Sequence, residues 1–182
     1  LVKLPSHRVE GLEDRAWERE WLKDFRPMQF GKRLWISPGD STVEQHDAVV
    51  IRLDPGLAFG TGTHATTALC LEWLDSLDLV DKTLLDYGCG SGVLAIAGLK
   101  LGWGSALAMD IDPQALVATS QNALRNGVSG QLRVQGSEEA IAGSFDIVVA
   151  NILAGPLVQF AESVTSTVSG GGMLALSGVL CE

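Results

Sequence analysis

Along most of this 182-residue chain, short apolar runs alternate with segments in which apolar residues recur at helical spacing. The alternation is regular from about residue 64 onward. It predicts helices over Thr66–Leu77, Val93–Leu101, Pro113–Asn126 and Leu157–Val168, and strands over Thr83–Tyr87, Ala106–Asp110, Leu132–Gln135, Phe145–Ala150 and Met173–Ser177. Buried strands that alternate with helices are typical of an α/β fold, so we expect a doubly wound parallel sheet.

The first third of the chain has a different pattern. Residues 1–13 have the composition of a linker, and apolar residues at helical spacing predict an amphipathic helix after it: Trp17, Trp21, Leu22 and Phe25. Short strand-like pieces then predict a small antiparallel appendage: Met28–Phe30, Leu34–Ser37 and Ala48–Leu53. We therefore divide the chain into a linker and helix, residues 1–25, and one domain, residues 26–182.

A glycine turn joins the first strand of the alternating part to its helix, in the sequence Asp86-Tyr87-Gly88-Cys89-Gly90-Ser91-Gly92. Glycines let a ligand approach the backbone closely, and the helix that follows offers unpaired N–H groups. Asp110 closes the next strand, 22 residues after Gly88, where a carboxylate can hold a ribose diol. A tight turn with an exposed acid is the alternative. The combination favours a cofactor that contains a nucleoside.

The spacing of the glycines separates two kinds of cofactor. A dinucleotide-binding site has the form G-x-G-x-x-G, which differs from the glycine spacing of this turn. A dehydrogenase is therefore the alternative interpretation. The form here, Asp-x-Gly-x-Gly-x-Gly, resembles motif I of the class I methyltransferases that use S-adenosylmethionine. That resemblance implies a Rossmann-like core in which Asp110 holds the ribose of the cofactor.

Two further segments carry candidate chemistry. Gly56–Thr67 is rich in Gly and Thr and precedes a helix. It is either an ordinary helix-entry loop or a lid, with Phe59 packing near the cofactor and a Thr hydroxyl bonding it. Within it, His64 could suggest a general base, but an exposed loop histidine is the simpler interpretation.

Asn151 ends an apolar run, at the strand edge where reacting groups meet in parallel sheets. It could orient an incoming amine or satisfy loop backbone. Methyltransferases of planar amides or bases often have Asn-Pro-Pro-Tyr here. The sequence Asn-Ile-Leu lacks that aromatic residue and favours a flexible aliphatic amine.

Taken together, these segments and Asp110-Ile111-Asp112-Pro113 closely resemble the bacterial ribosomal protein L-eleven methyltransferase family over residues 14–182. The resemblance implies an N-methylase of lysine and α-amino groups, with ribosomal large-subunit protein eleven as substrate. It implies cofactor contacts at Thr67, Gly88, Gly90, Asp110 and Asn151, with Phe59 on a mobile loop and Glu138 near the adenine. We expect Asn151 also to act in catalysis.

Family members also carry an amino-terminal domain that recognises the ribosomal protein, and a carboxyl-terminal hairpin. We expect both to be missing from this chain. The alternative function is a class I methyltransferase of another protein, a small molecule or a nucleic acid, or a binding module without activity.

Composition narrows the partners. The chain has 13 Lys and Arg against 22 Asp and Glu, a net charge of −9, which suits a basic partner better than a nucleic acid.

The three cysteines, Cys70, Cys89 and Cys181, show no metal-type spacing and no disulfide framework. We expect no metal. Because a disulfide framework is absent from the cysteine pattern, a reducing cytosol is the default, and we expect a cytoplasmic protein. Apolar runs are too short for a membrane helix, and no signal peptide is visible.

Overall fold

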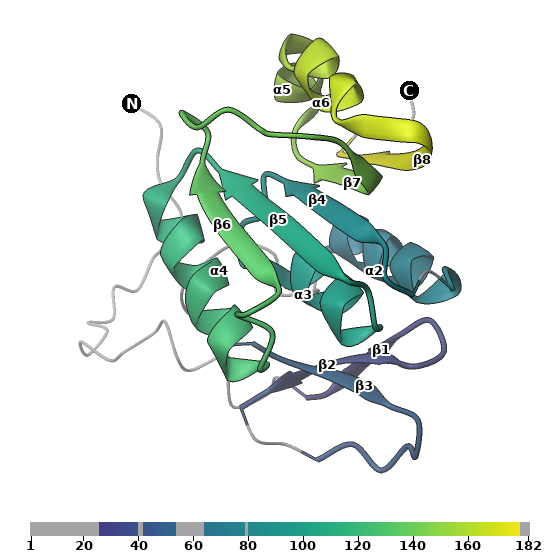
Figure 1. Cartoon of the computed structure of the whole chain (residues 1–182). Coiled ribbons are helices and arrows are strands. Elements are labelled where there is room, and N and C mark those ends of the chain that lie inside the picture. Colours follow the sequence, from purple (N-terminus) through teal and green to yellow (C-terminus); the bar gives the residue numbers. More distant parts are fainter. Residues whose placement is uncertain (1–25, 40–41, 54–63, 79, 179–182) are drawn as a thin grey trace, which may run out of the picture.

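A computed structural model describes residues 26–39, 42–53, 64–78 and 80–178. Its larger sheet has five parallel strands in the order β6-β5-β4-β7-β8 (Figure 1). These are β4 (Thr83–Tyr87), β5 (Ser105–Asp110), β6 (Leu132–Gly136), β7 (Phe145–Asn151) and β8 (Val168–Ser177). The predicted parallel α/β sheet is confirmed. Because β4 lies between β5 and β7, their carboxyl ends meet at the centre of one sheet edge.

Helices cover both faces of this sheet, as a doubly wound fold requires. One face packs on α2 (Ala65–Ser76), α3 (Val93–Lys100) and α4 (Pro113–Arg125), and the other on α5 (Ala154–Gln159) and α6 (Ala161–Ser166). Alternate residues of a strand point to opposite faces. Accordingly, Leu84 lies in the first core and its neighbour Leu85 in the second.

A smaller sheet lies beyond α3, so that α3 is packed between the two sheets (Figure 1). It contains β1 (Met28–Phe30), β2 (Leu34–Pro38) and β3 (Val49–Leu53). Every residue from Val93 to Leu99 is buried as a result. Asn126, the C-cap residue of α4, holds this sheet, because its amide accepts from the Arg52 backbone N–H and donates to the Arg52 carbonyl, each at 2.8 Å.

The expected antiparallel appendage is wrong in one of its two pairings. Strands β1 and β2 are antiparallel, but β2 and β3 are parallel. Apolar alternation does not specify strand direction. A connection of about ten residues, at roughly 3.3 Å per residue, is long enough to return along a strand of half that length and start a parallel partner. The predicted linker and helix over residues 1–25 lie outside the described residues.

The helix expected over Leu157–Val168 is also wrong. The segment forms α5 and α6, which are separated at Phe160, where the backbone leaves helical geometry (φ −104°, ψ 14°). Strand β8 begins at Val168 rather than Met173. The β7–β8 register shifts between Phe145 and Ile147, and this irregularity accommodates the glycine-rich start of β8.

Candidate functional site

A cavity of about 840 Å³ opens at the carboxyl ends of the central strands. Ligands in open α/β sheets bind at this edge, where the strand order reverses. The wall comes from the start of α2, the glycine turn after β4, the ends of β5 and β7, and helices α5 and α6. Its residues are His64, Thr66, Tyr87, Gly88, Gly90, Met109, Asp110, Ile111, Ser137, Asn151, Ile152, Leu153, Pro156, Phe160, Ser163 and Gly178.

The glycine turn uses its glycines for two separate reasons. Gly88, Gly90 and Gly92 have φ angles of +79°, +54° and +75°, a region that L side chains rarely adopt. In addition, a Cβ at Gly88 would overlap the side chain of Ile152. The turn is therefore a cradle that fits closely against the segment after β7.

Helix α4 and strand β5 hold the turn from behind. The backbone N–H groups of Gly88 and Cys89 both donate to the Met109 carbonyl at 2.9 Å. Thr119 donates its hydroxyl to the Gly90 carbonyl at 3.1 Å, and Asn122 donates its amide to the Ser91 carbonyl at 2.9 Å. The conformation of the turn is thus fixed by bonds that leave its cavity side open.

Asp110 is fixed by the backbone on both sides. One carboxylate oxygen accepts the Gly90 N–H at 2.9 Å and the other accepts the Asp112 N–H at 3.0 Å. A carboxylate oxygen has two acceptor positions, so each can take a further hydrogen bond. Asp110 is therefore oriented for a pair of hydroxyl groups and joined to the glycine turn.

Asp86 lies beneath the turn and is 1% exposed. Its Oδ2 accepts the Ala95 N–H at 3.0 Å in the first turn of α3, whose own N-cap, Gly92, has no side chain to do so. Its Oδ1 is buried and has no hydrogen-bond partner among the described residues. Burial raises the pKa of Asp86 to about 7; the bond from Ala95 opposes this rise and the charge of Asp110 adds to it.

Asn151 is the last residue of β7 and lies on the cavity wall. Its Nδ2 donates to the hydroxyl of Thr67 at 3.2 Å. Thr67 is in the first turn of α2, is 1% exposed, and does not itself line the cavity. The structure therefore brings Gly88, Gly90, Asp110 and Asn151 to one cavity and places Thr67 behind Asn151.

Comparison with known proteins identifies the family. The sequence model described as "Ribosomal protein L11 methyltransferase (PrmA)" matches residues 1–182. The chain belongs to this methyltransferase family. Curated relatives of that name from Aliivibrio fischeri (strain MJ11) and Edwardsiella ictaluri are 56% and 58% identical, over 96% and 97% of this chain. The chain covers 60% of the length of each of these two relatives.

A solved structure supports the same assignment. The crystal structure titled ribosomal protein L11 methylase, from Lactobacillus delbrueckii subsp. bulgaricus, is 36% identical with a TM-score of 0.76. That match covers 85% of this chain and 80% of the other. An RNA methyltransferase from Salinibacter ruber, 19% identical with a TM-score of 0.53, shares the fold. The family resemblance and the methyltransferase core predicted from sequence are confirmed.

Two residues that the family resemblance singled out are not in the cavity wall as described. Glu138 lies on the exposed turn after β6, with its carboxylate packed against Gly136, whereas its neighbour Ser137 does line the cavity. Phe59 lies outside the described residues. The adenine contact at Glu138 and the lid at Phe59 stay predictions.

The sequence analysis did not predict several residues of the cavity wall. Tyr87 is part of the glycine-turn motif and Ile152 follows Asn151, so their position next to predicted site residues was a usable signal. Phe160 had no such signal, because its ring meets Tyr87 only in the folded chain, with ring centres 6.4 Å apart.

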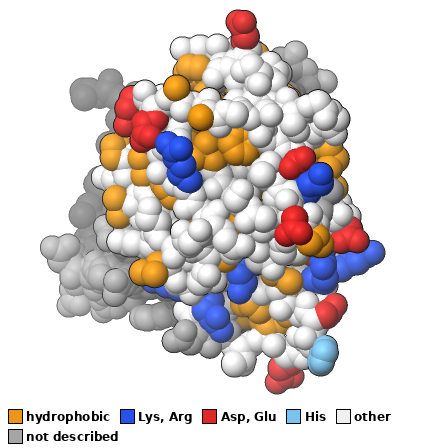
Figure 2. Space-filling model, in the orientation of Figure 1, with side chains coloured by type: hydrophobic (Ala, Val, Ile, Leu, Met, Phe, Trp, Pro, Cys, Tyr) orange, Lys and Arg blue, Asp and Glu red, His pale blue; other side chains and the backbone are white. Residues whose placement is uncertain are grey.

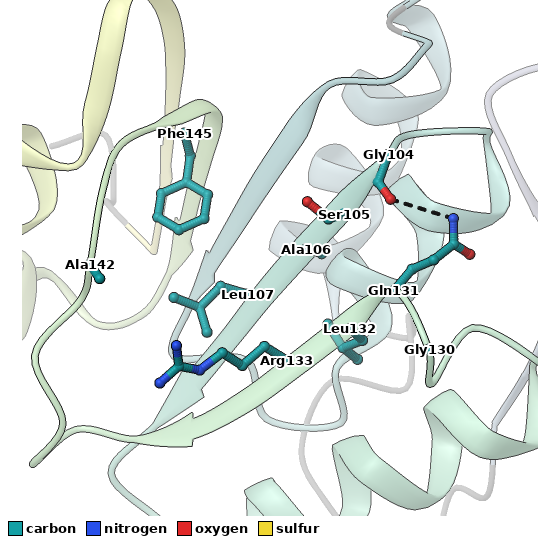
Figure 3. Close-up of a pocket in the computed structure, with 10 residues that line it drawn as sticks. All are labelled: Gly104, Ser105, Ala106, Leu107, Gly130, Gln131, Leu132, Arg133, Ala142 and Phe145. Carbon is teal, nitrogen blue, oxygen red and sulfur yellow. Dashed lines mark hydrogen bonds between the residues drawn. The ribbon is translucent and has the colours of Figure 1, made fainter.

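A second cavity of about 460 Å³ lies at the opposite end of the strands. Figure 3 shows Leu107, Arg133 and Phe145 around it, near the beginnings of β5, β6 and β7. Arg133 forms an ion pair with Glu139 at 3.2 Å. This cavity is at the opposite end of the strands from the glycine turn, so the larger cavity is the candidate functional site. Within the described residues, no cluster of three or more metal-ligating side chains and no helix able to span a bilayer was found.

Asp86 yields a pH-dependent prediction. Its ordinary pKa of 3.8 is raised to about 7 in the folded chain, so the folded state holds the proton more tightly between these values. Stability should therefore fall as pH rises through this window. Asp86→Asn keeps an acceptor for Ala95 but cannot ionise. The free energy of unfolding of the variant should therefore rise relative to that of the parent protein as the pH is raised from about 5 to about 8.

Urea unfolding at both pH values measures this change. Asp78→Asn, at an exposed aspartate, is the matched control and should show no comparable gain. An Asp86→Asn stability difference that is equal at both pH values would contradict the buried, proton-binding role.

Proposed function

We propose that this chain transfers the methyl group of S-adenosylmethionine to amine nitrogens of a protein, the substrate being the ribosomal protein named in its relatives. The observation that carries the proposal is the convergence of the glycine turn, Asp110 and Asn151 on one cavity. The names of the 56–58% identical relatives support the substrate, although the chain spans only part of their length. A ribosomal-protein substrate would place the reaction in the cytoplasm.

The residues of the cavity fit this cofactor. Gly88 and Gly90 leave the backbone accessible, and Asp110 is oriented to accept from ribose hydroxyls. Met109 and Ile111 provide apolar surface beside Asp110 for a flat base. When bound, S-adenosylmethionine supplies an electrophilic methyl group on a positively charged sulfur.

The protein then has to present a neutral amine. A lysine amine has a pKa of about 10.4 in water, so it must lose a proton before it can attack. Tyr87, Leu153 and Phe160 give the cavity an apolar wall, and burial against such a wall disfavours the charged form. Asn151 orients the amine by hydrogen bonding. We propose no dedicated general base.

The alternative substrates receive less support. On the face in Figure 2, Lys and Arg side chains are interspersed with Asp and Glu rather than gathered into one basic surface. Beside Asn151, Ile152 packs against Gly88, so this position offers no ring to stack on a planar base. The two aromatic rings of the cavity, Tyr87 and Phe160, lie beside each other, with ring centres 6.4 Å apart. Among the described residues, these features favour an aliphatic amine over a nucleobase.

Calorimetric titration with S-adenosylmethionine tests the proposal, with a nicotinamide dinucleotide as the control ligand. We expect micromolar binding of the first alone. Transfer of labelled methyl groups to the ribosomal protein, compared with ribosomal RNA, then tests the substrate. Absence of binding to a chain that circular dichroism shows to be folded would overturn the proposal.

Asn151→Ala should lower turnover by about tenfold, the scale of one hydrogen bond to a polar group, and change cofactor affinity much less. Gln121→Ala, which removes an exposed amide on α4, is the control and should leave both quantities unchanged. Turnover equal to the parent protein would remove Asn151 from the mechanism.

A further inference from the structure

We infer that Phe160 is a specificity-determining residue, whose ring forms with Tyr87 the wall along which the methylene stem of an acceptor lysine lies. This inference rests on the proposed function and deepens it, because it separates two kinds of amine that the cavity could accept. A lysine carries its amine at the end of a flexible chain of four methylene groups, whereas an α-amine is bonded directly to the backbone carbon. A wall that binds the stem therefore favours lysine.

Phe160 is exposed although its neighbours on the same two helices are not. Leu157 and Val164 are buried in the second core, whereas the Phe160 side chain is 38% exposed and lines the cavity. Leu153, on the same wall, is 75% exposed. Apolar surface in contact with water is unfavourable, and a ligand that covers it gains the free energy of its burial. Phe160 and Leu153 thus offer apolar surface to a ligand in the cavity.

The backbone fixes the place of the Phe160 ring. Pro156, Phe160 and Ser163 all line the cavity and are four and three residues apart, a spacing that puts side chains on one side of a helix. The chain leaves helical geometry at Phe160, yet its N–H donates to the Pro156 carbonyl and its carbonyl accepts the Val164 N–H, each at 2.9 Å. The division between α5 and α6 therefore does not turn the ring away from the cavity.

Tyr87 completes this wall. The centre of its ring lies 6.4 Å from that of Phe160, and the two ring planes are tilted by 44°. Aromatic rings at this separation form a packed pair, so a flat base does not fit between them. The surface that the pair offers to a ligand is broad and apolar, which suits a stem of methylene groups.

Asn151 lies on the other side of the sheet edge. Alternate residues of a strand point to opposite faces, so Asn151 shares its face with Val149, which is buried in the first core. Its amide accordingly meets Thr67 of α2. Tyr87 packs against the second core, on the face that α5 and α6 cover. A side chain that reaches Asn151 through the cavity therefore lies between the amide and the aromatic wall.

The stem of a lysine fits this space, because lysine buries its stem along apolar surface while its amine reaches a polar group. Burial of a single methylene group changes a binding constant about fourfold. The Phe160 ring covers the stem from one side only. We therefore expect its contribution to equal the burial of about one to two methylene groups, or about fourfold to fifteenfold. An α-amine has no stem and gains nothing from this ring.

Two acceptor peptides of matched sequence test the inference. One has a blocked amino terminus and a single lysine, and the other has a free amino terminus and no lysine. We expect Phe160→Ala to lower kcat/KM about fourfold to fifteenfold for the lysine peptide and less than about twofold for the α-amine peptide. Phe160→Leu keeps apolar surface at this position and should restore most of the loss. Val158→Ala, at an α5 residue that is 80% exposed and outside the cavity wall, is the matched control.

Calorimetric titration gives a readout that needs no acceptor. The affinity of Phe160→Ala for S-adenosylmethionine should stay within about twofold of the parent protein, because the wall serves the acceptor. A large loss of that affinity would assign the ring to the base of the cofactor and overturn the inference. Equal losses of kcat/KM for both peptides, or no loss for either, would overturn it as well. If thermal unfolding shows that Phe160→Ala does not fold, Leu153→Ala tests the same wall and should lower kcat/KM for the lysine peptide alone.

The proposed function fails by a different result. If the parent protein neither binds S-adenosylmethionine nor methylates either peptide, the proposed function fails, and the role of the wall fails with it. If the parent protein methylates both peptides and Phe160→Ala leaves the ratio of their kcat/KM values unchanged, only the inference about Phe160 fails.

Discussion

Replacing Gly88 with valine is expected to abolish detectable binding of S-adenosylmethionine. The new Cβ would overlap Ile152, and Gly88 has a φ of +79°. A non-glycine residue in the left-handed region costs about 1–2 kcal/mol, and a branched side chain costs more. Since Ile152 directly follows Asn151, its displacement would also move Asn151, which we propose to orient the amine. Calorimetric titration measures the loss of binding.

Three further variants separate the steric effect from the backbone effect. Gly127→Ala places a side chain at a φ of +70° where nothing lies within 4 Å. It should lose about 1 kcal/mol of stability and bind the cofactor normally. The double variant Gly88→Ala/Ile152→Ala removes the overlap and should bind more tightly than Gly88→Ala alone. If Gly88→Val binds as well as the parent protein, the close fit at Gly88 has no role in the site.

Asp110→Ala is expected to weaken S-adenosylmethionine binding by about 1–3 kcal/mol, or up to about hundredfold, the scale of charge-assisted hydrogen bonds. The structure gives a second reason for a value near the upper end. Without the carboxylate, the Gly90 N–H loses its acceptor and the glycine turn loses one of its anchors. Calorimetry gives the affinity, and thermal unfolding shows whether the fold persists.

The control for Asp110 is its near neighbour. Asp112 caps α4 by accepting the Gln114 N–H at 2.9 Å and does not line the cavity. Asp112→Ala should lower stability by about 1 kcal/mol, as the loss of a helix cap does, and leave affinity within about twofold. Equal affinities for Asp110→Ala and the parent protein would mean that the ribose is bound elsewhere.

Helices and strands that are specified by residues close together in the chain were predictable from the sequence. Strand β4 and helix α3 are specified by an apolar run, a glycine turn and a second apolar run, all within residues 83–100. Gly88, Gly90 and Asp110 follow from the same local pattern, because a strand end in a parallel sheet determines where its last side chain lies. Their presence on one cavity wall agrees with the prediction, and their binding of the cofactor stays a prediction.

Features that depend on contacts between distant segments were not predictable. Phe160 keeps the helical spacing of its neighbours Leu157 and Val164, yet the helix divides there, beside the ring of Tyr87. The apolar pattern did not indicate the direction of the strands in the small sheet. The hydrogen bond between Thr67 and Asn151 joins two elements that no spacing rule relates, so the place of Thr67 behind Asn151 was not predictable, and its contact with the cofactor stays a prediction.

The two roles that we propose for the cavity come from different parts of the chain. The glycine turn and Asp110 lie within one uninterrupted stretch from β4 to β6, residues 83–136. Thr67 precedes this stretch, while Asn151 and Phe160 follow it. Under the proposed function, mutations in the flanking segments, other than at Ile152 where it packs against Gly88, would alter which nucleophile is accepted and leave the residues proposed to hold the nucleoside unchanged. Such an arrangement would let the acceptor specificity change at the two flanks while the proposed binding of the methyl donor is kept.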